Sequence, residues 1–280
     1  MFSILLSIIL LFIQTPSSLF QGNQVVSYPY SLGPVLSAKS ALVADKETEK
    51  ILYEKSKEEI LPIASLTKLM TAIVFLENRN IEFEDFIVFK KEDQAEPTRM
   101  KVLPGEKVRV KDIFEAALVG SANDAAKILS RLTKEPEKFV ELMNLKAKEF
   151  DLEKTEFFEP TGLDPKNVSC ASDLVLFFEK ALEKEEIAEA LKKTEISFKV
   201  KKADNSFYWR RIKNTNKLLN GSINFLAKTG YLEESGHCFI GLTKNEDQEL
   251  IVVILNAPSS KQRFEEVKVL FGWVSKAFQK

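Results

Sequence analysis

Residues 40–80 read SALVADKETEKILYEKSKEEILPIASLTKLMTAIVFLENRN. Two short apolar runs flank a charged turn at the start of this stretch, which predicts a β-hairpin. From Ser65 onward the apolar residues recur at helical spacing, so we expect a helix with Ser65 near its first residue. A serine therefore lies where an extended segment gives way to a helix.

The rest of the chain mixes the same two kinds of element. Between residues 85 and 191 the pattern is mostly helical, with helices expected over 112–118, 122–132 and 173–191 and a turn-rich loop over 160–165. Strand patterns return at 238–243 and 250–255 around a polar turn. This order predicts an α+β fold: an antiparallel β-sheet flanked by helices, with a helical subdomain inserted in the middle.

A last helix is expected over 259–280. It carries one apolar stripe, formed by Phe264, Val267, Phe271, Val274 and Phe278. A helix lying on a membrane surface would show the same stripe, but the other face of this one is not strongly basic. We therefore expect it to pack on the domain.

Composition excludes several classes of protein. The 280 residues are 45% apolar, too many for a disordered chain, and 40 Lys and Arg against 41 Asp and Glu argue against a partner nucleic acid. His237 is the single histidine, so a metal site built on several histidines cannot form within one chain. Cys170 and Cys238 lack the spacing of a metal or redox motif, and we expect both to be free and buried.

The N-terminus predicts export from the cytoplasm. Residues 1–20 contain no charged side chain, and the apolar run FSILLSIILLFI at 2–13 is too short to span a bilayer. It fits the apolar region of a signal peptide that is either cleaved or kept as an N-terminal membrane anchor. We expect a linker over 21–36 and one folded domain over 37–280.

Three short segments carry chemistry. In the first, Ser65-Leu66-Thr67-Lys68, residues i and i+3 share a helix face, so the Lys68 amine can reach the Ser65 hydroxyl and activate it as a nucleophile. Burial or a second cation would lower the pKa of Lys68 toward neutrality, as a general base requires. The positive end of the helix would also favour an oxyanion there.

The second and third segments follow much later in the chain. In the second, Ser121 could relay a proton and Asn123 could bind a substrate carbonyl and brace Lys68. In the third, Lys228-Thr229-Gly230, we expect a strand at one edge of the site, where glycine lets a substrate backbone approach. Lys228 would add positive charge, which lowers the pKa of Lys68 and attracts a carboxylate, and Thr229 would offer it a hydroxyl.

Taken alone, each segment has an ordinary structural explanation: a helix N-cap beside a solvated lysine, a second helix cap, and a turn at the end of a strand. Together and in this order, S-x-x-K, S-x-N and K-T-G are the signature of penicillin-binding proteins and class A β-lactamases. The chain resembles the D-alanyl-D-alanine carboxypeptidases, the serine peptidase family of the low-molecular-weight penicillin-binding proteins. The resemblance runs from Ser37 to Phe278 and includes SANDAA, PTGLD and NTNKLL.

The resemblance implies an acyl-enzyme mechanism without a cofactor or metal. Ser65 matches the nucleophile, Lys68 its base, and Ser121 and Asn123 the second motif. The third motif, with Tyr231 after it, would bind substrate, the Tyr231 N–H joining that of Ser65 at the oxyanion. Arg263 stands where family members have an arginine for the terminal carboxylate. The implied substrates are peptidoglycan stem peptides ending in D-Ala-D-Ala, with β-lactams as inhibitors.

Departures from the family pattern leave alternatives open. Leu232 stands where the family usually has Thr, Ala227 replaces the common Ile or Met, and only 50 residues follow Gly230, so we expect no C-terminal β-domain. Shorter relatives include D,D-endopeptidases that cut cross-links. A class A β-lactamase is a second alternative, because Glu159-Pro160 lies in a comparable loop. A non-catalytic domain that binds peptidoglycan or senses β-lactams is the third.

Overall fold

The structure, a computed structural model, describes residues 33–219, 221, 223–245 and 248–278. Gly33–Lys280 form one compact unit. The segment expected to direct export (residues 1–20) and the linker up to residue 32 lie outside the described residues. No helix in the described ranges is both long enough and apolar enough to cross a membrane.

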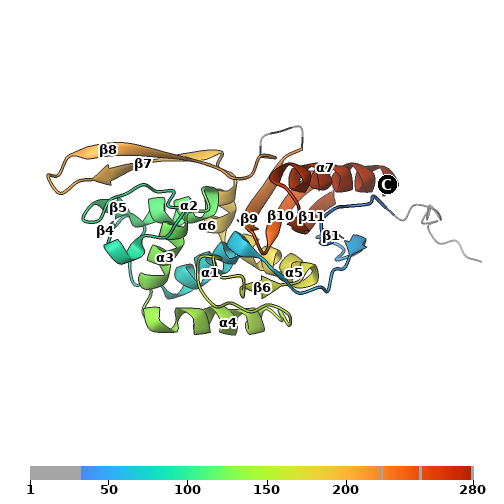
Figure 1. Cartoon of the computed structure of the whole chain (residues 1–280), viewed down its shortest axis with the longest axis horizontal. Helices are drawn as coiled ribbons and strands as arrows, with labels where there is room; N and C mark the ends of the chain where they lie inside the picture. Colours follow the sequence, from blue (N-terminus) through green and yellow to red (C-terminus); the bar gives the residue numbers. More distant parts are fainter. Residues whose placement is uncertain (1–32, 220, 222, 246–247, 279–280) are drawn as a thin grey trace, which may run out of the picture. The chain divides into compact units, whose positions relative to one another are not determined.

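A five-stranded antiparallel sheet joins the two ends of this unit (Figure 1). Its strand order is β2 (Ile51–Lys55), β1 (Ser40–Asp45), β11 (Gln248–Ala257), β10 (Gly236–Asn245) and β9 (Phe225–Leu232). Strand β1 pairs with β11, which places Leu42 opposite Val253. The predicted first and last hairpins are thereby confirmed as parts of one sheet, with β9 at its edge.

Helices cover both faces of this sheet. Val43 and Val252 belong to the cluster that contains Val267 and Leu270 of α7 (Ser260–Ala277), whereas Leu42 and Val253 face the core that contains α5 (Ala171–Leu182). The two layers are visible in Figure 1. Because β11 is buried on both sides, its sequence LIVVIL is continuously apolar. The prediction that the last helix packs on the domain is confirmed.

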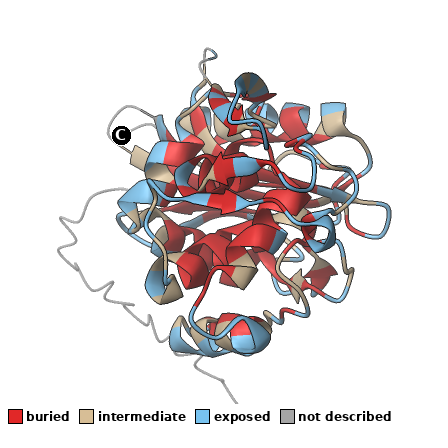
Figure 2. Cartoon of the chain, turned by 90° about the vertical axis from the view of Figure 1, so that its left-hand side faces the viewer, coloured by how far each residue is buried: buried red, intermediate tan, exposed pale blue. Residues whose placement is uncertain are grey.

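The helical region surrounds one buried helix. A short 3-10 turn, η1 (Ala64–Thr67), leads into α1 (Lys68–Asn78), whose first two turns are buried throughout. Around it lie α2 (Val110–Val119), α3 (Asn123–Arg131), α4 (Phe139–Glu149) and α5, and α6 (Glu185–Leu191) packs against α2 and α5. Figure 2 shows the buried residues concentrated in the middle of the molecule, whereas the helix at the bottom of the view is mostly intermediate or exposed. The predicted α+β architecture is confirmed.

The prediction of a mostly helical middle was wrong in two places. Short strands β4 (Phe86–Val88) and β5 (Lys107–Arg109) lie within it, in a second sheet with β7 (Glu195–Lys201) and β8 (Phe207–Lys213). The helix expected over 173–191 is two helices, because Lys184 adopts an extended backbone that lets α6 turn Ile187 and Leu191 into the core. The smallest elements are β3 (Leu61–Pro62), β6 (Val168–Ser169), η2 (Lys91–Asp93) and η3 (Pro136–Lys138).

Candidate active site

The three predicted segments meet at one pocket of about 500 Å³ beside β9. Seven of the nine predicted site residues line it: Ser65, Ser121, Asn123, Thr229, Gly230, Tyr231 and Arg263. The other two, Lys68 and Lys228, lie fully buried beneath it. Distant parts of the chain therefore converge as the motif reading predicted.

Ser65 is held in the 3-10 turn that precedes α1. The Thr67 hydroxyl donates to the Ala64 carbonyl at 2.7 Å and closes the turn. Gly162 presses on this turn from the neighbouring loop: a Cβ there would lie 2.1 Å from the Ala64 oxygen, and its φ is +79°. Only glycine allows that approach, which fixes the position of the Ser65 backbone.

Lys68 uses its amine on three partners. Its Nζ lies 2.8 Å from the Ser65 Oγ and 2.8 Å from the Asn123 Oδ1, and it also donates to the Thr161 carbonyl. An ammonium group has three hydrogens to donate, so these partners account for all of them. The predicted contact between Ser65 and Lys68 is present in the described structure, and Asn123 braces the lysine.

Burial and, after it, the charge of the nearby Arg99 lower the pKa of Lys68 to about 7, whereas Glu159 and Asp124 act in the opposite direction. A lysine that is half neutral near pH 7 suits a general base. We expected Lys228 to be the second cation that depresses this pKa. Arg99 is the cation that lowers it, and the repulsion between the two lysines appears instead at Lys228, whose pKa Lys68 lowers.

Lys228 forms a second serine–lysine pair. Its Nζ donates to the Ser121 Oγ at 2.7 Å and to the Thr229 carbonyl at 3.0 Å. Burial lowers its pKa well below the ordinary value, and the charges of Lys68, Arg99 and Arg263 add to this. Ser121 has a φ of +56°, a left-handed conformation that non-glycine residues rarely adopt. The orientation of its hydroxyl therefore comes with conformational strain in the backbone.

Strand β9 runs directly against the turn that carries Ser65. A Cβ at Gly230 would lie 2.8 Å from the Ile63 oxygen and 3.1 Å from the Ser65 nitrogen, so the strand can approach this closely only with glycine there. The neighbouring Thr229 hydroxyl donates to the Thr215 Oγ1 at 2.7 Å. The edge strand and the nucleophile therefore share one wall of the pocket.

Arg263 reaches the pocket from α7 but is largely committed to the backbone. Its Nη1 donates to the Gly230 carbonyl at 3.0 Å and to the Cys238 carbonyl at 3.2 Å, and its Nη2 donates to the Ser260 Oγ at 3.3 Å. The side chain is 5% exposed, and burial lowers its pKa to about 10. It holds β9 and β10 together at the pocket floor.

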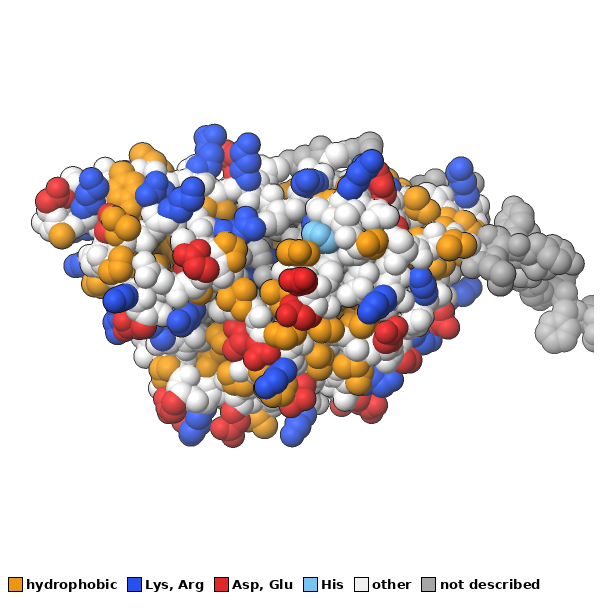
Figure 3. Space-filling model, viewed as in Figure 1, with side chains coloured by type: hydrophobic (Ala, Val, Ile, Leu, Met, Phe, Trp, Pro, Cys, Tyr) orange, Lys and Arg blue, Asp and Glu red, His pale blue; other side chains and the backbone are white. Residues whose placement is uncertain are grey.

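Two aromatic rings form the mouth of the pocket. Tyr231 stacks on His237 of the neighbouring strand, with ring centroids 4.3 Å apart. His237, the pale blue side chain in Figure 3, lies on the face shown there. Tyr231 is 58% exposed, so its ring is available to a ligand while its backbone stays in the sheet.

Glu159 organises the loop that holds Lys68. Its carboxylate accepts from the backbone N–H groups of Thr161 at 2.7 Å, Gly162 at 2.5 Å and Leu163 at 2.9 Å, and from the Asn167 amide at 2.8 Å. These bonds bend the loop so that the Thr161 carbonyl reaches the lysine. The Glu159 carboxylate is therefore hydrogen-bonded within the protein.

Three functional contributions were missed from the sequence. The Thr161 carbonyl is a backbone atom and has no mark in the sequence. Asp124 is fully buried and holds the segment around Thr98, but its position next to Asn123 reads as an ordinary helix start. Arg99 lines the pocket from that segment, where no periodicity points to it.

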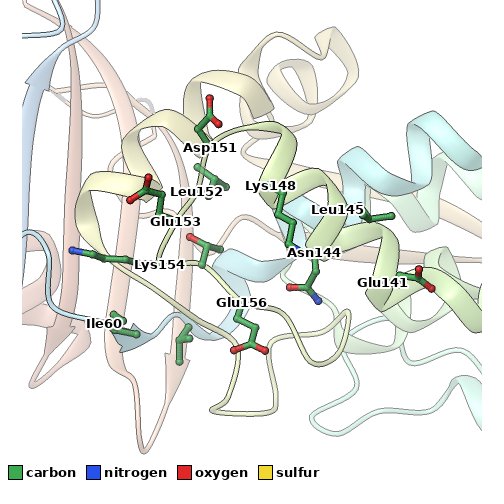
Figure 4. A pocket seen from close by; sticks show the side chains of 12 residues that line it. Ile60, Glu141, Asn144, Leu145, Lys148, Asp151, Leu152, Glu153, Lys154 and Glu156 are labelled. Carbon is green, nitrogen blue, oxygen red and sulfur yellow. The ribbon is translucent and has the colours of Figure 1, made fainter.

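A second, larger hollow of about 850 Å³ lies between α4 and the loop after it. It contains none of the predicted site residues, and the charged side chains labelled in Figure 4, among them Glu141, Asp151, Lys154 and Glu156, point in different directions. Lys154 instead pairs with Glu58 at 2.7 Å. Size alone therefore does not identify the active site.

Ser65 is hydrogen-bonded to the fully buried Lys68, and a second serine–lysine pair lies beneath the same pocket. This arrangement defines a serine acyl-transfer enzyme. Comparison with known proteins gives the family. The family model described as D-alanyl-D-alanine carboxypeptidase matches residues 28–259. The chain belongs to the D-alanyl-D-alanine carboxypeptidase family, which confirms the resemblance of the motifs.

Individual relatives agree with this assignment. The D-alanyl-D-alanine endopeptidase of Pseudomonas aeruginosa is 30% identical over 244 residues, 85% of this chain and 77% of that protein. The D-alanyl-D-alanine carboxypeptidase DacF of Bacillus subtilis is 30% identical over 254 residues, 86% of this chain and 63% of its own length.

Solved structures share the fold. Penicillin-binding protein D2 of Listeria monocytogenes, in its cefotaxime-bound form, is 29% identical with a TM-score of 0.74, and the match covers 88% of this chain and 99% of that one. The Streptomyces K15 DD-transpeptidase has a TM-score of 0.82 with the same coverage, and at 22% identity it shows the fold alone.

Proposed function

We propose that this chain hydrolyses the terminal D-Ala-D-Ala bond of peptidoglycan stem peptides through an acyl-enzyme on Ser65. The observation that carries the proposal is the set of three partners around Lys68. Two of them, the Asn123 Oδ1 and the Thr161 carbonyl, can only accept hydrogen bonds. A neutral amine has two hydrogens and one lone pair, so its lone pair is left to face the Ser65 hydroxyl.

The reaction then balances with the groups present. The Ser65 Oγ attacks the carbonyl carbon of the scissile bond while its proton passes to the Lys68 Nζ. The tetrahedral intermediate collapses, the C–N bond breaks, and D-alanine leaves with a proton delivered through the lysines and Ser121. Water then attacks the ester, its proton passes to Lys68, and the Ser65 Oγ takes a proton back as the peptide leaves.

The remaining predicted residues are proposed to bind the substrate. The backbone N–H groups of Ser65 and Tyr231 would hold the oxyanion, which is supported by the close approach of β9 to the nucleophile turn. Asn123 has amide hydrogens for a peptide carbonyl, although one is used on the Glu96 carbonyl at 3.2 Å. Thr229 and Lys228 would attract a carboxylate, and Arg263 would contribute positive charge from below.

A D,D-endopeptidase is the second candidate. Three of the similar proteins, from Pseudomonas aeruginosa, Escherichia coli and Haemophilus influenzae, carry the name D-alanyl-D-alanine endopeptidase at 30–34% identity. The chemistry at Ser65 would be identical, and only the leaving group would be larger. Mass spectrometry of digested muropeptides separates the two: loss of one alanine indicates a carboxypeptidase, and conversion of dimers to monomers indicates an endopeptidase.

The other two alternatives receive less support. A class A β-lactamase needs a free carboxylate to activate the deacylating water, but the Glu159 carboxylate is bonded to the loop around it. A non-catalytic domain would have no use for a lysine held against Ser65 in a buried site. Labelling with penicillin tests the β-lactamase alternative, since we expect a long-lived adduct on the wild type and none on Ser65→Ala. Release of D-alanine from a stem peptide by the wild type, but not by Ser65→Ala, tests the non-catalytic alternative.

We further propose that the enzyme acts outside the cytoplasm, on the substrate its family implies. The apolar run at residues 2–13 supports export, and residues 1–20 would serve as a cleaved signal or as a membrane anchor. Fractionation of cells that produce the full chain tests this. Recovery of the protein in the cytoplasmic fraction, at full length, would contradict it.

A further inference from the structure

Arg99 is an exposed cation that lines the active-site pocket beside Asn123 of α3. Strand β9 lines another part of the same pocket. Among the described residues its guanidinium makes no hydrogen bond and no ion pair. An unpaired guanidinium facing a substrate pocket is unusual, because arginine in such sites generally holds a carboxylate or phosphate.

The segment that carries Arg99 is fixed in place from α3. The Asn123 Nδ2 donates to the Glu96 carbonyl at 3.2 Å. The fully buried Asp124 carboxylate accepts from the Thr98 hydroxyl and, at 3.2 Å, from the Met100 N–H. The residues on either side of Arg99 are thus tied to the protein, and the arginine between them lines the pocket.

The other cations at the pocket are already hydrogen-bonded to protein atoms. Arg263, the arginine that the family resemblance assigns to the terminal carboxylate, is 5% exposed and uses its Nη1 and Nη2 atoms on Gly230, Cys238 and Ser260, and its Nε, without a hydrogen-bond partner in the described part of the chain, is buried. Leu232 lines the pocket where the family usually offers a threonine hydroxyl. Two of the expected carboxylate partners are therefore occupied or replaced.

We infer that Arg99 binds a carboxylate of the peptide substrate and that Asp124 is the positioning residue that aims it. The inference rests on the proposed peptidase function and deepens it by naming a specificity residue. The carboxylate is either the terminal one of the leaving D-alanine or one on the acyl side of the scissile bond. Both would be held by the same bidentate geometry, so substrates must distinguish them.

The test is steady-state kinetics of the full-length enzyme on three matched synthetic peptides: one ending in D-Ala-D-Ala with neutral side chains, its C-terminal amide, and a form with an added carboxylate at the residue before D-Ala-D-Ala. Wild-type turnover of the first peptide checks the proposed function independently. Arg99→Ala should lower kcat/KM about 10- to 100-fold, mainly through KM, on a peptide that carries the bound carboxylate. Arg99→Lys should restore part of it.

The substrate comparison identifies the source. If Arg99→Ala affects the free acid but not the amide, the terminal carboxylate is bound; if it affects only the peptide with the added carboxylate, the acyl side is bound. Equal losses on all three peptides would overturn the inference, because Arg99 would then act through the pKa of Lys68. Lys101→Ala, which removes a charge from the same segment outside the pocket, should leave all three rates unchanged.

Asp124 has its own readout. Asp124→Asn should raise KM for the same peptide, and in a double-mutant cycle with Arg99→Ala the second change should add little, because both act on one contact. If Asp124 had only a structural role, the effects of the two changes on kcat/KM would be additive. Asp124→Asn would then lower both kcat and the thermal unfolding midpoint. Additive losses would remove Asp124 from the inference.

Discussion

Replacing Gly230 by alanine should separate the nucleophile from its edge strand. The added Cβ would lie 2.8 Å from the Ile63 oxygen and 3.1 Å from both the Ala64 Cβ and the Ser65 nitrogen, whereas ordinary contact begins at 3.4 Å. Most of these are backbone atoms, so β9 or the turn must move by about 0.6 Å. Misplacement by 1 Å can cost about 100-fold in rate, so we expect a loss of about 10- to 100-fold in acylation.

The assay is the second-order rate of labelling by a fluorescent penicillin, followed alongside thermal unfolding. Gly241→Ala is the matched control, because its Cβ would lie 2.8 Å from the Ala227 Cβ and from the Phe239 ring, away from the nucleophile. Overpacking of this kind costs about 1–3 kcal/mol. We expect both variants to lose stability and only Gly230→Ala to lose acylation; a wild-type labelling rate for Gly230→Ala would refute the reasoning.

The acylation rate should rise with pH through about 7, the pKa of Lys68, because only the neutral amine can accept a proton. Below this pKa the rate should fall about tenfold per pH unit. Lys68→Arg should not be labelled by penicillin at any pH. Glu159→Gln should destabilise the protein by about 2 kcal/mol in urea unfolding, since backbone N–H groups lose a charged acceptor, while deacylation of the penicillin adduct stays slow; fast turnover abolished by this change would instead indicate a β-lactamase. Arg131→Ala should cost about 3 kcal/mol, because Asp93 is 1% exposed and would be left unpaired, whereas Lys192→Ala, which breaks an exposed ion pair, should cost under about 0.5 kcal/mol; equal effects would contradict the burial argument.

The parts of the site that local geometry determines were predictable. Ser65 and Lys68 are three residues apart at a helix start, and their side chains meet at 2.8 Å. No local rule joins them to Ser121, 56 residues later, or to Lys228. That convergence depends on sheet pairing and helix packing, and only the three motifs in their order indicated it.

The sequence could not predict tertiary contacts made by backbone atoms or by residues that belong to no motif or periodic pattern. The Thr161 carbonyl holds Lys68 because the Glu159 carboxylate bends its loop, which is a tertiary arrangement. Arg99 reaches the pocket because Asp124 anchors its neighbours, and neither residue belongs to a periodic pattern. Propensity and spacing carry no information on such contacts.

In the fold, one overlooked element did have a signal. Ile196, Phe198 and Val200 alternate with polar residues in β7, a period of two that predicts a strand with one buried face. The break between α5 and α6 has no such mark, because neither Gly nor Pro stands at Lys184. There the packing of α6 overrides a continuous helical preference.

The two buried lysines beneath the pocket serve catalysis but lower the stability of the fold. Lys68 and Lys228 are both fully buried, and an amine in such surroundings opposes folding. A methionine of similar length in place of Lys228 should therefore raise the unfolding temperature while removing penicillin labelling, as calorimetry and gel fluorescence would record. Selection for thermal stability alone would replace these lysines. Their presence therefore indicates that the chain is kept for its catalytic activity.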